Sequence, residues 1–519
     1  MFFVNKRRGQ VKIRTNIMYY PSLSEFRKLA KRGNLIPVYR EILADLETPV
    51  SAFLKIARDT PYAYLLESVE GQEKIGRYSF LSANPSLIFK SKGESVYLII
   101  DGQETEIKMK QDPLDNLKEV MHRYKPVKVK GLPRFFGGMV GYISYDMVRF
   151  FEKLPDKNPD DLNLPDSIFL LTDTLLIFDH IEHSIKIVSN VVIKDNPDYA
   201  YQTACLKIEF LVKRLKEPLK ANSRASSTTT SSGRVYSANS SKEKFKSNLT
   251  KNEFERIVKK AKEYIKKGDI IQTVLSQRIE TKIDANPFDV YRALRIVNPS
   301  PYMYYLKMGN LKVIGSSPEV FLRVEDGIAT VRPIAGTRPR GIDEKEDRKL
   351  ETQLLSDEKE RAEHVMLVDL GRNDLGRVCE YGSVQLNESM SIEKYSHVMH
   401  IVSEITGKLH KGKDGFDCVR ACFPAGTVSG APKIRAMEVI DELEPLKRGL
   451  YAGAVGYFSF SGNVDTCITI RTILMNKASA YIQAGAGIVA DSRPENEYRE
   501  TLNKARALLK AIEMAQVGL

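Results

Sequence analysis

Apolar residues recur at helical spacing in three stretches of the second half of the chain. The first predicted helix covers residues 252–269 and ends at Gly268, a residue suited to a left-handed helix end. Its apolar face consists of Phe254, Ile257, Val258, Ala261 and Ile265. A second helix is predicted from Ser356, as its N-terminal cap, to about Gly371, and a third from a capping box at Ser492 to the C-terminus.

Other stretches show the short apolar runs or the alternation that is typical of strands. They are residues 95–100, 183–193, 464–473 and 481–489. Strands and helices intermingle without strict alternation along the chain. The sequence therefore predicts an α+β fold.

A low-complexity segment divides the chain into two parts. Residues 221–241 hold eleven Ser/Thr among twenty-one residues and almost no apolar side chains, which predicts a linker. It separates an N-terminal part, residues 18–220, from a C-terminal part, residues 242–519. Residues 1–17 are predicted to be a disordered extension.

The two parts share one short motif, glycine-x-valine-glycine-tyrosine-x-serine-aromatic, at residues 138–145 and 453–460. Glycine weakens a strand and marks a place where another backbone or a ligand comes close. We therefore predict two large mixed α/β parts with paired antiparallel sheets, one from each part, flanked by helices.

The formal net charge of +13 is concentrated in two segments. Residues 1–17 carry five Lys/Arg and no acid, and residues 213–251 carry ten Lys/Arg and two acids, so the rest of the chain is formally neutral. No nucleic-acid partner is predicted for the folded parts. Nucleic-acid binding through the two basic segments stays open as an alternative.

Apolar runs and cysteines bear on the cellular setting. The longest apolar run, residues 167–178, is interrupted by polar residues and is too short to span a bilayer, so no membrane segment is predicted. The five cysteines contain one close pair, Cys418 and Cys422, with no second pair to complete a zinc site. Reduced thiols and a cytoplasmic location are predicted.

Residues 332–341, RPIAGTRPRG, combine three arginines, two prolines and two glycines. Proline fixes φ and removes a donor, and glycine allows a ligand to approach the backbone, so neither a helix nor a central strand is expected. The segment is either a surface turn with solvated charges or a shaped, ligand-facing loop.

Two glutamates on separate predicted helices are candidate metal ligands. Glu363 shares a helical stripe with Leu367, at the edge of a face that requires burial, and Glu500 shares a face with small residues. One interpretation is that each carboxylate is solvated or lies at the rim of a buried helix face. The other is that the two carboxylates together hold Mg²⁺, which prefers carboxylate oxygens.

Four further features could bind anions or transfer protons. Residues 483–488 run through glycines whose N–H groups could cradle a carboxylate, unless they form a bulge. Arg471, in a predicted strand with Cys467, Thr469 and Ile473 on its face, requires a carboxylate partner. His400 is a core histidine or a catalyst. A glycine-rich loop enters a helix near Pro432, which favours anions.

Together these stretches resemble the chorismate-utilising enzymes, in particular the large subunits of anthranilate synthase. The N-terminal part contributes YLLES (64–68), IGRYSF (75–80) and GGMVGYISYD (137–146). The C-terminal motifs, in order, are NPSPYMYYL (298–306), GSSPEVFL (315–322), RPIAGTRPRG (332–341), ERAEHVMLVDLGRNDLGR (360–377), HVMHIVSEITG (397–407), FPAGTVSGAPKIRAMEVIDELEP (423–445), LYAGAVGYFSFSGNVDTCITIRT (450–472), QAGAGIVADS (483–492) and ETLNKARALL (500–509).

The resemblance implies that the chain converts chorismate and ammonia to anthranilate and pyruvate, at the start of tryptophan biosynthesis. It implies Mg²⁺ held by Glu363 and Glu500, Glu319 as the general acid, His400 as the base, and Thr427 beside them. The implied substrate contacts are Gly336, Thr337, Tyr451, Arg471, Gly485, Ala486 and Gly487.

Two positions separate this reading from related activities. Aminodeoxychorismate synthases, the main alternative, commonly carry a lysine where this chain has Ala335, and alanine cannot attack the ring covalently. Isochorismate and salicylate synthases place a water-activating lysine at the position of Gln272. The resemblance therefore favours direct addition of ammonia.

The resemblance also implies a partner and an inhibitor. The sequence contains no G-x-C-x-G nucleophile motif of a glutamine amidotransferase. A separate glutamine amidotransferase subunit would therefore deliver ammonia. Ser68, Pro301, Tyr302 and Met303 occupy the family's tryptophan-inhibition site, which predicts feedback regulation.

Overall fold

The computed structural model describes residues 18–68, 76–219, 245–395 and 398–519. The predicted extension, residues 1–17, and the predicted linker, residues 221–241, lie outside these ranges. The part boundaries based on them remain predictions.

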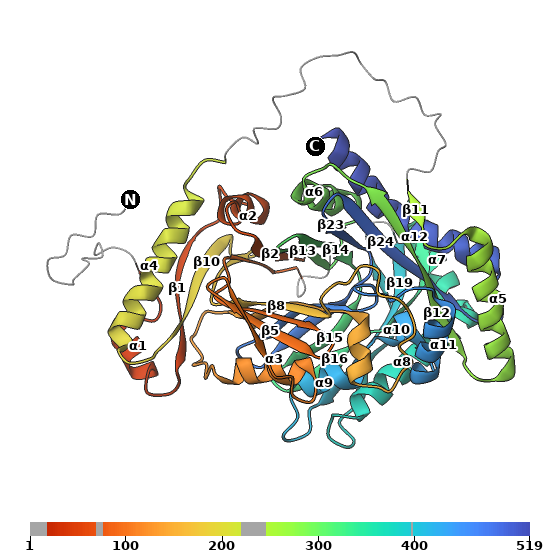
Figure 1. The fold of residues 1–519 in the computed structure, drawn as a ribbon, viewed down its shortest axis with the longest axis horizontal. Coiled ribbons are helices and arrows are strands. Elements are labelled where there is room, and N and C mark those ends of the chain that lie inside the picture. The colour runs from red at the N-terminus through yellow and green to blue at the C-terminus, as the bar shows by residue number, and fades with distance from the viewer. Residues whose placement is uncertain (1–17, 69–75, 220–244, 396–397) are drawn as a thin grey trace, which may run out of the picture.

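Two antiparallel sheets form the body of the described chain (Figure 1). The first runs β1 (Leu35–Leu43), β10 (Ser184–Val192), β9 (Thr174–Asp179), β3 (Tyr78–Ala83), β2 (Tyr62–Glu67), β13 (Tyr302–Met308), β14 (Leu311–Ser317), β23 (Thr472–Asn476), β24 (Ser479–Ile488), β12 (Gln272–Lys282) and β11 (Lys246–Ser247), with β20 (Gly430–Ala431) also on β12. The second runs β17 (Ile334–Pro339), β19 (Val398–Lys408), β16 (Ile328–Val331), β15 (Val320–Glu325), β22 (Val464–Ile468), β21 (Ala454–Ser459), β7 (Gly138–Ile143), β8 (Ser167–Thr172), β4 (Ile88–Lys92), β5 (Ser95–Ile100) and β6 (Gln103–Ile107), with β18 (Gln385–Lys394) on β19.

Each sheet takes strands from both parts of the chain, so the prediction of one sheet from each part is wrong. The repeated motif forms the seam of the second sheet, where β7 pairs directly with β21 and Gly141 lies opposite Gly456. A Cβ atom on either glycine would collide with a carbonyl oxygen of the next strand, Ile168 or Asp465. The predicted close approach of backbones is therefore confirmed, and so is the α+β class with paired antiparallel sheets.

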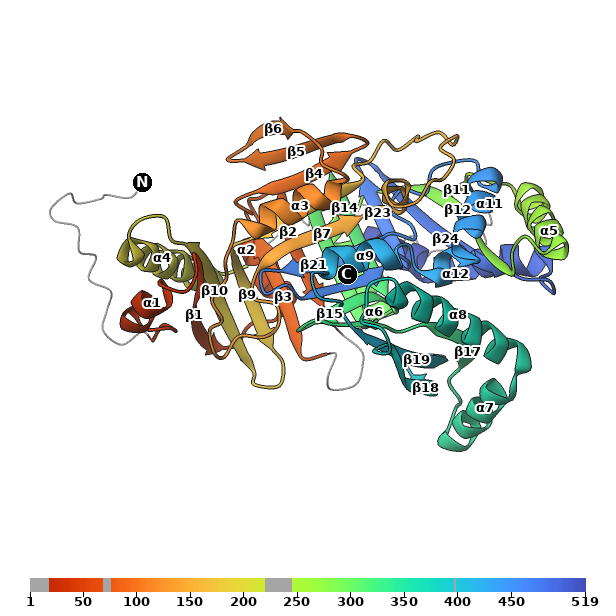
Figure 2. The same ribbon diagram turned by 90° about the horizontal axis from the view of Figure 1, so that it is seen from below.

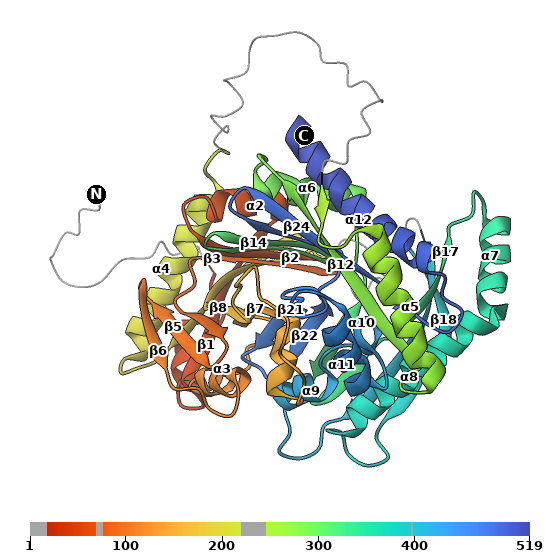
Figure 3. The same cartoon turned by 45° about the vertical axis from the view of Figure 1, so that its right-hand side comes forward.

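Helices cover the outer faces, and the two sheets enclose a core between them. On the first sheet lie α2 (Pro49–Ile56), α4 (Pro197–Leu215), α6 (Pro287–Val297) and α12 (Pro494–Val517), with α1 (Leu23–Leu29) against α4 and α5 (Lys251–Lys267) against α12 (Figure 3). On the second sheet lie α3 (Pro113–His122), α7 (Glu344–Ser356), α8 (Glu358–Gly376) and α9 (Gly415–Cys422), as Figure 2 shows from below. The short α10 (Gly426–Ser429) leads through β20 into α11 (Lys433–Leu443), which packs on β12.

Local sequence signals predicted many of these elements. The helix expected over residues 252–269 is α5, capped by Thr250 and ended by Gly268 with a φ of 82°. Two predicted caps are wrong. Asp357, rather than Ser356, accepts the first backbone N–H groups of α8, which continues to Gly376. Arg493 is the N-cap of α12, and the Ser492 hydroxyl binds the Val489 N–H instead of a capping box.

The single strand predicted over residues 464–473 is also wrong, because the chain leaves one sheet and enters the other there. β22 belongs to the second sheet and β23 to the first, and Arg471 between them has a left-handed φ of 49°. The chain crosses in the same way at Glu319, between β14 and β15. Backbone hydrogen bonds join the two crossings, from the Ile468 N–H to the Glu319 oxygen and from the Ser316 N–H to the Arg471 oxygen. Both candidate residues therefore sit where the two sheets meet.

Two composition-based expectations can be compared with the structure. Within residues 18–68, 76–219, 245–395 and 398–519, none of the helices combines the length and apolar character needed to cross a membrane. All five cysteines are buried and free of disulfide bonds.

Candidate active site

The segment RPIAGTRPRG contains the whole of β17, an edge strand of the second sheet that pairs with β19 through an irregular register between Ala335 and Arg338. The expectation that it is neither helix nor central strand is confirmed. Gly336 lies at the irregularity with a φ of 64°, a conformation that favours glycine. The carbonyl of Gly336 consequently turns toward β19.

That carbonyl orients His400. The Nδ1 of His400 lies 2.8 Å from the Gly336 oxygen and 3.1 Å from the Thr337 hydroxyl. A carbonyl oxygen only accepts, so Nδ1 carries the proton and Nε2 is left as the basic nitrogen. Burial lowers the pKa of His400, which favours the neutral imidazole. The structure thus brings together Gly336, Thr337 and His400.

Glu319 and Thr427 line one small cavity of about 40 Å³. Burial raises the pKa of Glu319 to about 7, and the nearby Thr427 hydroxyl and the Lys504 charge partly oppose this. The Thr427 Oγ1 is buried and makes no hydrogen bond with the described residues. A carboxyl group with such a pKa can donate a proton near neutrality. Glu319 therefore has the properties of a general acid.

Glu363 projects from α8 toward the first sheet. The Gln272 Nε2 on β12 donates a hydrogen bond to the Glu363 Oε1 at 2.9 Å. A Cβ atom on Gly487 of β24 would lie 2.6 Å from that Gln272 nitrogen, so a side chain there would displace the Gln272 amide. Burial raises the pKa of Glu363, and the charges of Glu360 and Glu500 raise it further.

The Glu500 carboxylate on α12 pairs with a lysine one turn further along the same helix. The Lys504 Nζ lies 2.6 Å from the Glu500 Oε1 and also donates to the carbonyl oxygen of Gly485 at 2.9 Å. The Glu500 charge raises the pKa of Glu363, so the two carboxylates interact although they come from different helices. Two carboxylates and open positions for water or substrate oxygens form a donor set that fits Mg²⁺.

Tyr451 is buried and Arg471 is half-buried, and the Glu500 charge acts on both side chains. The Arg471 guanidinium donates to the Lys504 carbonyl oxygen at 2.9 Å, and no carboxylate of the described residues lies within ion-pair distance of it. Burial lowers the pKa of Arg471, while the Glu500 carboxylate and Tyr451 raise it. Such a guanidinium is available for a carboxylate that enters the site. The predicted strand-mates of Arg471 are not its neighbours on a strand, because the strand ends at Ile468.

The glycine stretch 485–487 is part of β24 rather than a loop after a strand. A Cβ atom on Gly485 would collide with the Tyr451 hydroxyl, so the absence of a side chain makes room for that phenol. Ala486 points the other way, into a core with Phe254 and Leu275. Only the backbone of Ala486 can therefore face the site.

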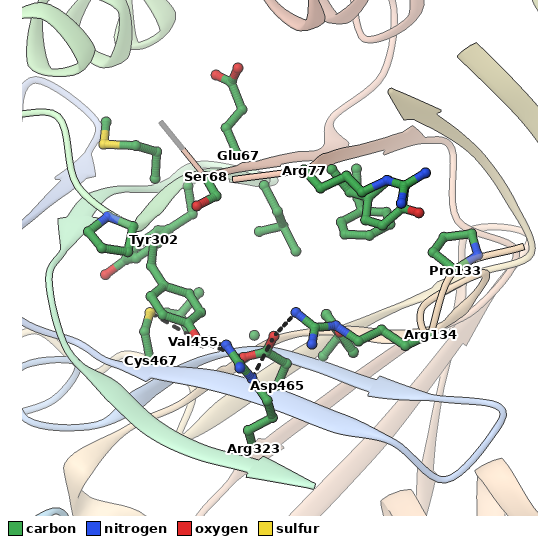
Figure 4. A pocket seen from close by; sticks show the side chains of 18 of the residues that line it. Glu67, Ser68, Arg77, Pro133, Arg134, Tyr302, Arg323, Val455, Asp465 and Cys467 are labelled. Carbon is green, nitrogen blue, oxygen red and sulfur yellow. Dashed lines mark hydrogen bonds and ion pairs between the residues drawn. The ribbon is translucent and has the colours of Figure 1, made fainter. Parts of the chain in front are cut away.

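A separate cavity of about 520 Å³ lies between the two sheets (Figure 4). All four residues predicted for an inhibitor site line it: Ser68, Pro301, Tyr302 and Met303. The Ser68 hydroxyl is buried and has no hydrogen-bond partner among the described residues. Such a hydroxyl is available to a ligand.

Sequence reasoning missed the polar groups of this cavity. The Tyr302 hydroxyl donates to Asp465 at 2.7 Å, and Arg134 and Arg323 pair with the same carboxylate. Figure 4 shows these side chains on the side of the cavity opposite Ser68. Nothing local in the sequence marks Asp465, since its partners are remote along the chain. Lys504 was missed as well, although its spacing of four residues from Glu500 was a usable signal.

Comparisons with known proteins agree with the motifs. The family model described as "chorismate binding enzyme" matches residues 62–510. The chain is 49% identical over 501 residues to "Anthranilate synthase component 1" of Acetivibrio thermocellus, covering 96% of this chain and 99% of that protein. It is 50% identical over 495 residues to the protein of the same name from Aquifex aeolicus, covering 95% and 98%.

Solved structures extend the agreement to the fold. The crystal structure of anthranilate synthase component I from Streptococcus pneumoniae matches with a TM-score of 0.71 and 38% identity, covering 90% of this chain and 98% of that one. The menaquinone-specific isochorismate synthase of Escherichia coli, at 19% identity and a TM-score of 0.66, shares the fold. On the family match and the near-full-length identity to these relatives, the chain belongs to the chorismate-binding enzyme family.

Proposed function

We propose that this chain is component 1 of an anthranilate synthase, which converts chorismate and ammonia to anthranilate and pyruvate in tryptophan biosynthesis. The observation that carries the proposal is that the Glu500 charge acts on both Glu363 and the half-buried Arg471, a guanidinium with no ion-pair partner among the described residues. Two acids and a free guanidinium suit a dicarboxylate substrate with a divalent cation. The proposal is supported by relatives with that name that are 48–50% identical over nearly their full length.

In the proposed complex, charged side chains and backbone positions without a side chain bind the substrate. In our proposal Arg471 and Tyr451 bind carboxylate oxygens of chorismate, and the β24 backbone at Gly485 and Gly487 lies close enough to contact them. Glu363 and Glu500 would hold Mg²⁺, which when bound neutralises the ring carboxylate. Gly336 and Thr337 lie beside the ring. This placement lowers the entropy cost of the reaction.

Two proton transfers then fall to residues with suitable pKa values. Glu319 donates its proton to the 4-hydroxyl group, which leaves as water while ammonia forms a bond to C2. In the second stage the His400 Nε2 takes the C2 proton as the C3–oxygen bond breaks. The group that leaves is enolpyruvate, which takes up a proton at its methylene carbon to become pyruvate, and the ring becomes aromatic. Thr427, which lines the same small cavity as Glu319, lowers the pKa of that proton donor.

The ammonia source and the regulation are parts of the same proposal. A separate glutamine amidotransferase component would supply ammonia, in keeping with the "component 1" names of the relatives. Tryptophan would bind in the cavity lined by Ser68 and Tyr302 and act as a feedback inhibitor.

The direct test is the fluorescence of anthranilate formed from chorismate, Mg²⁺ and ammonia by the purified full chain. Anthranilate formation is expected without the partner at high ammonia concentration, and glutamine is expected to replace ammonia only when the partner is added. Aminodeoxychorismate as the accumulating product would support the alternative function instead.

A further inference from the structure

The three arginines of RPIAGTRPRG have different partners. Arg332 binds Glu393 at 2.5 Å, and Arg340 binds Asp347 at 2.6 Å. Arg338 alone reaches α8, where it donates to Asp357 at 2.8 Å and to the Glu360 Oε1 at 3.3 Å. It thus connects the substrate-facing strand β17 to the helix that carries Glu363 (Figure 2).

Glu360 lies one helical turn before Glu363 and close to the site. Its Oε2 would be 3.1 Å from a Cβ atom on Gly336, so the carboxylate lies against the turn that orients His400. The charge of Glu360 also raises the pKa of Glu363. Glu360 is therefore a third carboxylate near the two proposed ligands.

The opposite helix has the same arrangement. Glu497 lies three residues before Glu500 on α12, and its pKa is raised by burial and by the Glu500 charge. Lys359 lowers the pKa of both Glu497 and Glu363. Glu-x-x-Glu pairs thus occur on both α8 and α12, and within the described residues no three acidic, histidine or cysteine side chains are gathered into a metal-binding group.

Four equivalent carboxylates would be a poor site for a metal-dependent reaction of a dianion. Extra carboxylate ligands would bind the cation more tightly, occupy positions that the substrate oxygens need, and repel the carboxylates of chorismate. A cation that pairs with one carboxylate removes its charge and holds its oxygens in another direction.

We propose that Arg338 keeps Glu360 out of the metal's coordination shell, so that Glu363 and Glu500 are the ligands and a coordination position stays open for the substrate carboxylate. This inference rests on the proposed function. Arg338 is a positioning residue that acts through Glu360. Arg332 and Arg340 cannot take this role, because Arg338 alone of the three arginines reaches α8.

The test is direct binding of Mn²⁺, used as a paramagnetic probe, to the full chain without chorismate, measured from the free-ion EPR signal. Arg338→Gln is expected to bind Mn²⁺ roughly 10-fold more tightly, the size expected of one added negative charge near a divalent cation in a partly buried site. The same variant is expected to have a raised KM for chorismate. Arg340→Gln, in the same ten-residue segment but paired with Asp347 of α7, is the matched control and should bind Mn²⁺ like the wild type.

If Arg338 made only a structural contact, its loss would weaken both metal binding and substrate binding. Tighter Mn²⁺ binding together with a raised KM for chorismate therefore identifies the proposed role. Glu360→Gln should weaken Mn²⁺ binding several-fold, because the Arg338 charge is then uncompensated, and the double variant should return to the wild-type affinity. If Glu360 were itself a ligand, the double variant would stay as weak as Glu360→Gln, which overturns the inference. Unchanged or weaker Mn²⁺ binding by Arg338→Gln also overturns it.

Failure of the underlying function gives a different result. If Glu363→Gln binds Mn²⁺ as the wild type does, the proposed metal site is wrong and this inference is overturned with it. If Glu363→Gln loses the ion while Arg338→Gln equals the wild type, only the inference fails. Should Arg338→Gln not fold, Glu360→Gln alone decides, because unchanged or tighter Mn²⁺ binding by that variant contradicts the role given to Arg338.

Discussion

The Nδ1 of His400 lies 2.8 Å from the carbonyl oxygen of Gly336, and this contact assigns the proton of the imidazole. Nδ1 must donate, so Nε2 is the nitrogen that can accept a proton from a substrate. The left-handed turn at Gly336 makes the contact possible. A loop rich in glycine and proline therefore sets the tautomer of a histidine 64 residues away.

The pH dependence of kcat/KM should follow Glu319 and His400. Glu319 acts protonated, so activity is expected to fall as pH rises through its pKa of about 7. His400 acts neutral, so activity is expected to fall as pH drops through its lowered pKa. The profile should be measured at a fixed concentration of free ammonia.

Thr427→Val provides the check on this assignment. The Thr427 hydroxyl lowers the pKa of Glu319, so its removal should move the alkaline limb to higher pH. A limb that stays in place or moves to lower pH would show that another group is the acid.

Glu363→Gln and Glu500→Gln are each expected to reduce kcat/KM by roughly 10²–10⁴-fold, because each removes one charge from the metal site. Glu513→Gln is a matched control, since Glu513 also lies on α12 near a lysine of its helix but is exposed, and its activity should be unchanged. Near-wild-type turnover by either site variant at millimolar Mg²⁺ would exclude that residue as a ligand.

Gln272→Lys should raise the Mg²⁺ concentration needed for half-maximal activity by roughly 10-fold, because an ammonium group beside Glu363 competes with the cation. Gln272→Leu removes the hydrogen bond without adding charge and should leave the Mg²⁺ requirement closer to that of the wild type. Equal Mg²⁺ requirements for the lysine variant and the wild type would mean that Gln272 is remote from the ion.

Ser68→Phe should relieve inhibition by tryptophan, because the aromatic ring fills the cavity and removes an unpaired hydroxyl. The inhibitory concentration is expected to rise by at least ~10-fold, the loss that corresponds to one buried hydrogen bond. Activity without tryptophan should be preserved. An unchanged inhibitory concentration would separate Ser68 from the regulatory site.

Local sequence patterns predicted the helices and strands whose formation depends on residues close together in the chain. The apolar period and Gly268 predicted α5, and the short apolar run at residues 95–100 predicted β5. The alternation at residues 464–473 could not reveal that the chain changes sheets at Arg471, because a positive φ leaves no mark in a hydrophobic pattern. The pairing of β7 with β21 joins segments that are more than 300 residues apart, and no local signal specifies it.

The candidate site was likewise predictable only in part. Motifs proposed Glu363, Glu500, His400 and Arg471, and the structure places Arg471 where the chain passes from one sheet to the other. The cations that act on Glu497 and Glu360 could not be predicted, because Lys359 and Arg338 belong to other elements than these acids. Residue types are visible in a sequence, whereas the pairing of charges depends on packing.

The central claim is that this chain aminates chorismate at C2 and releases pyruvate. The most direct measurement is to incubate the full chain with chorismate, Mg²⁺ and ¹⁵N-ammonium and to separate the products by chromatography with mass detection. The account predicts ¹⁵N-labelled anthranilate and an equal amount of pyruvate. Aminodeoxychorismate or isochorismate as the main product, or anthranilate without the label, would contradict it.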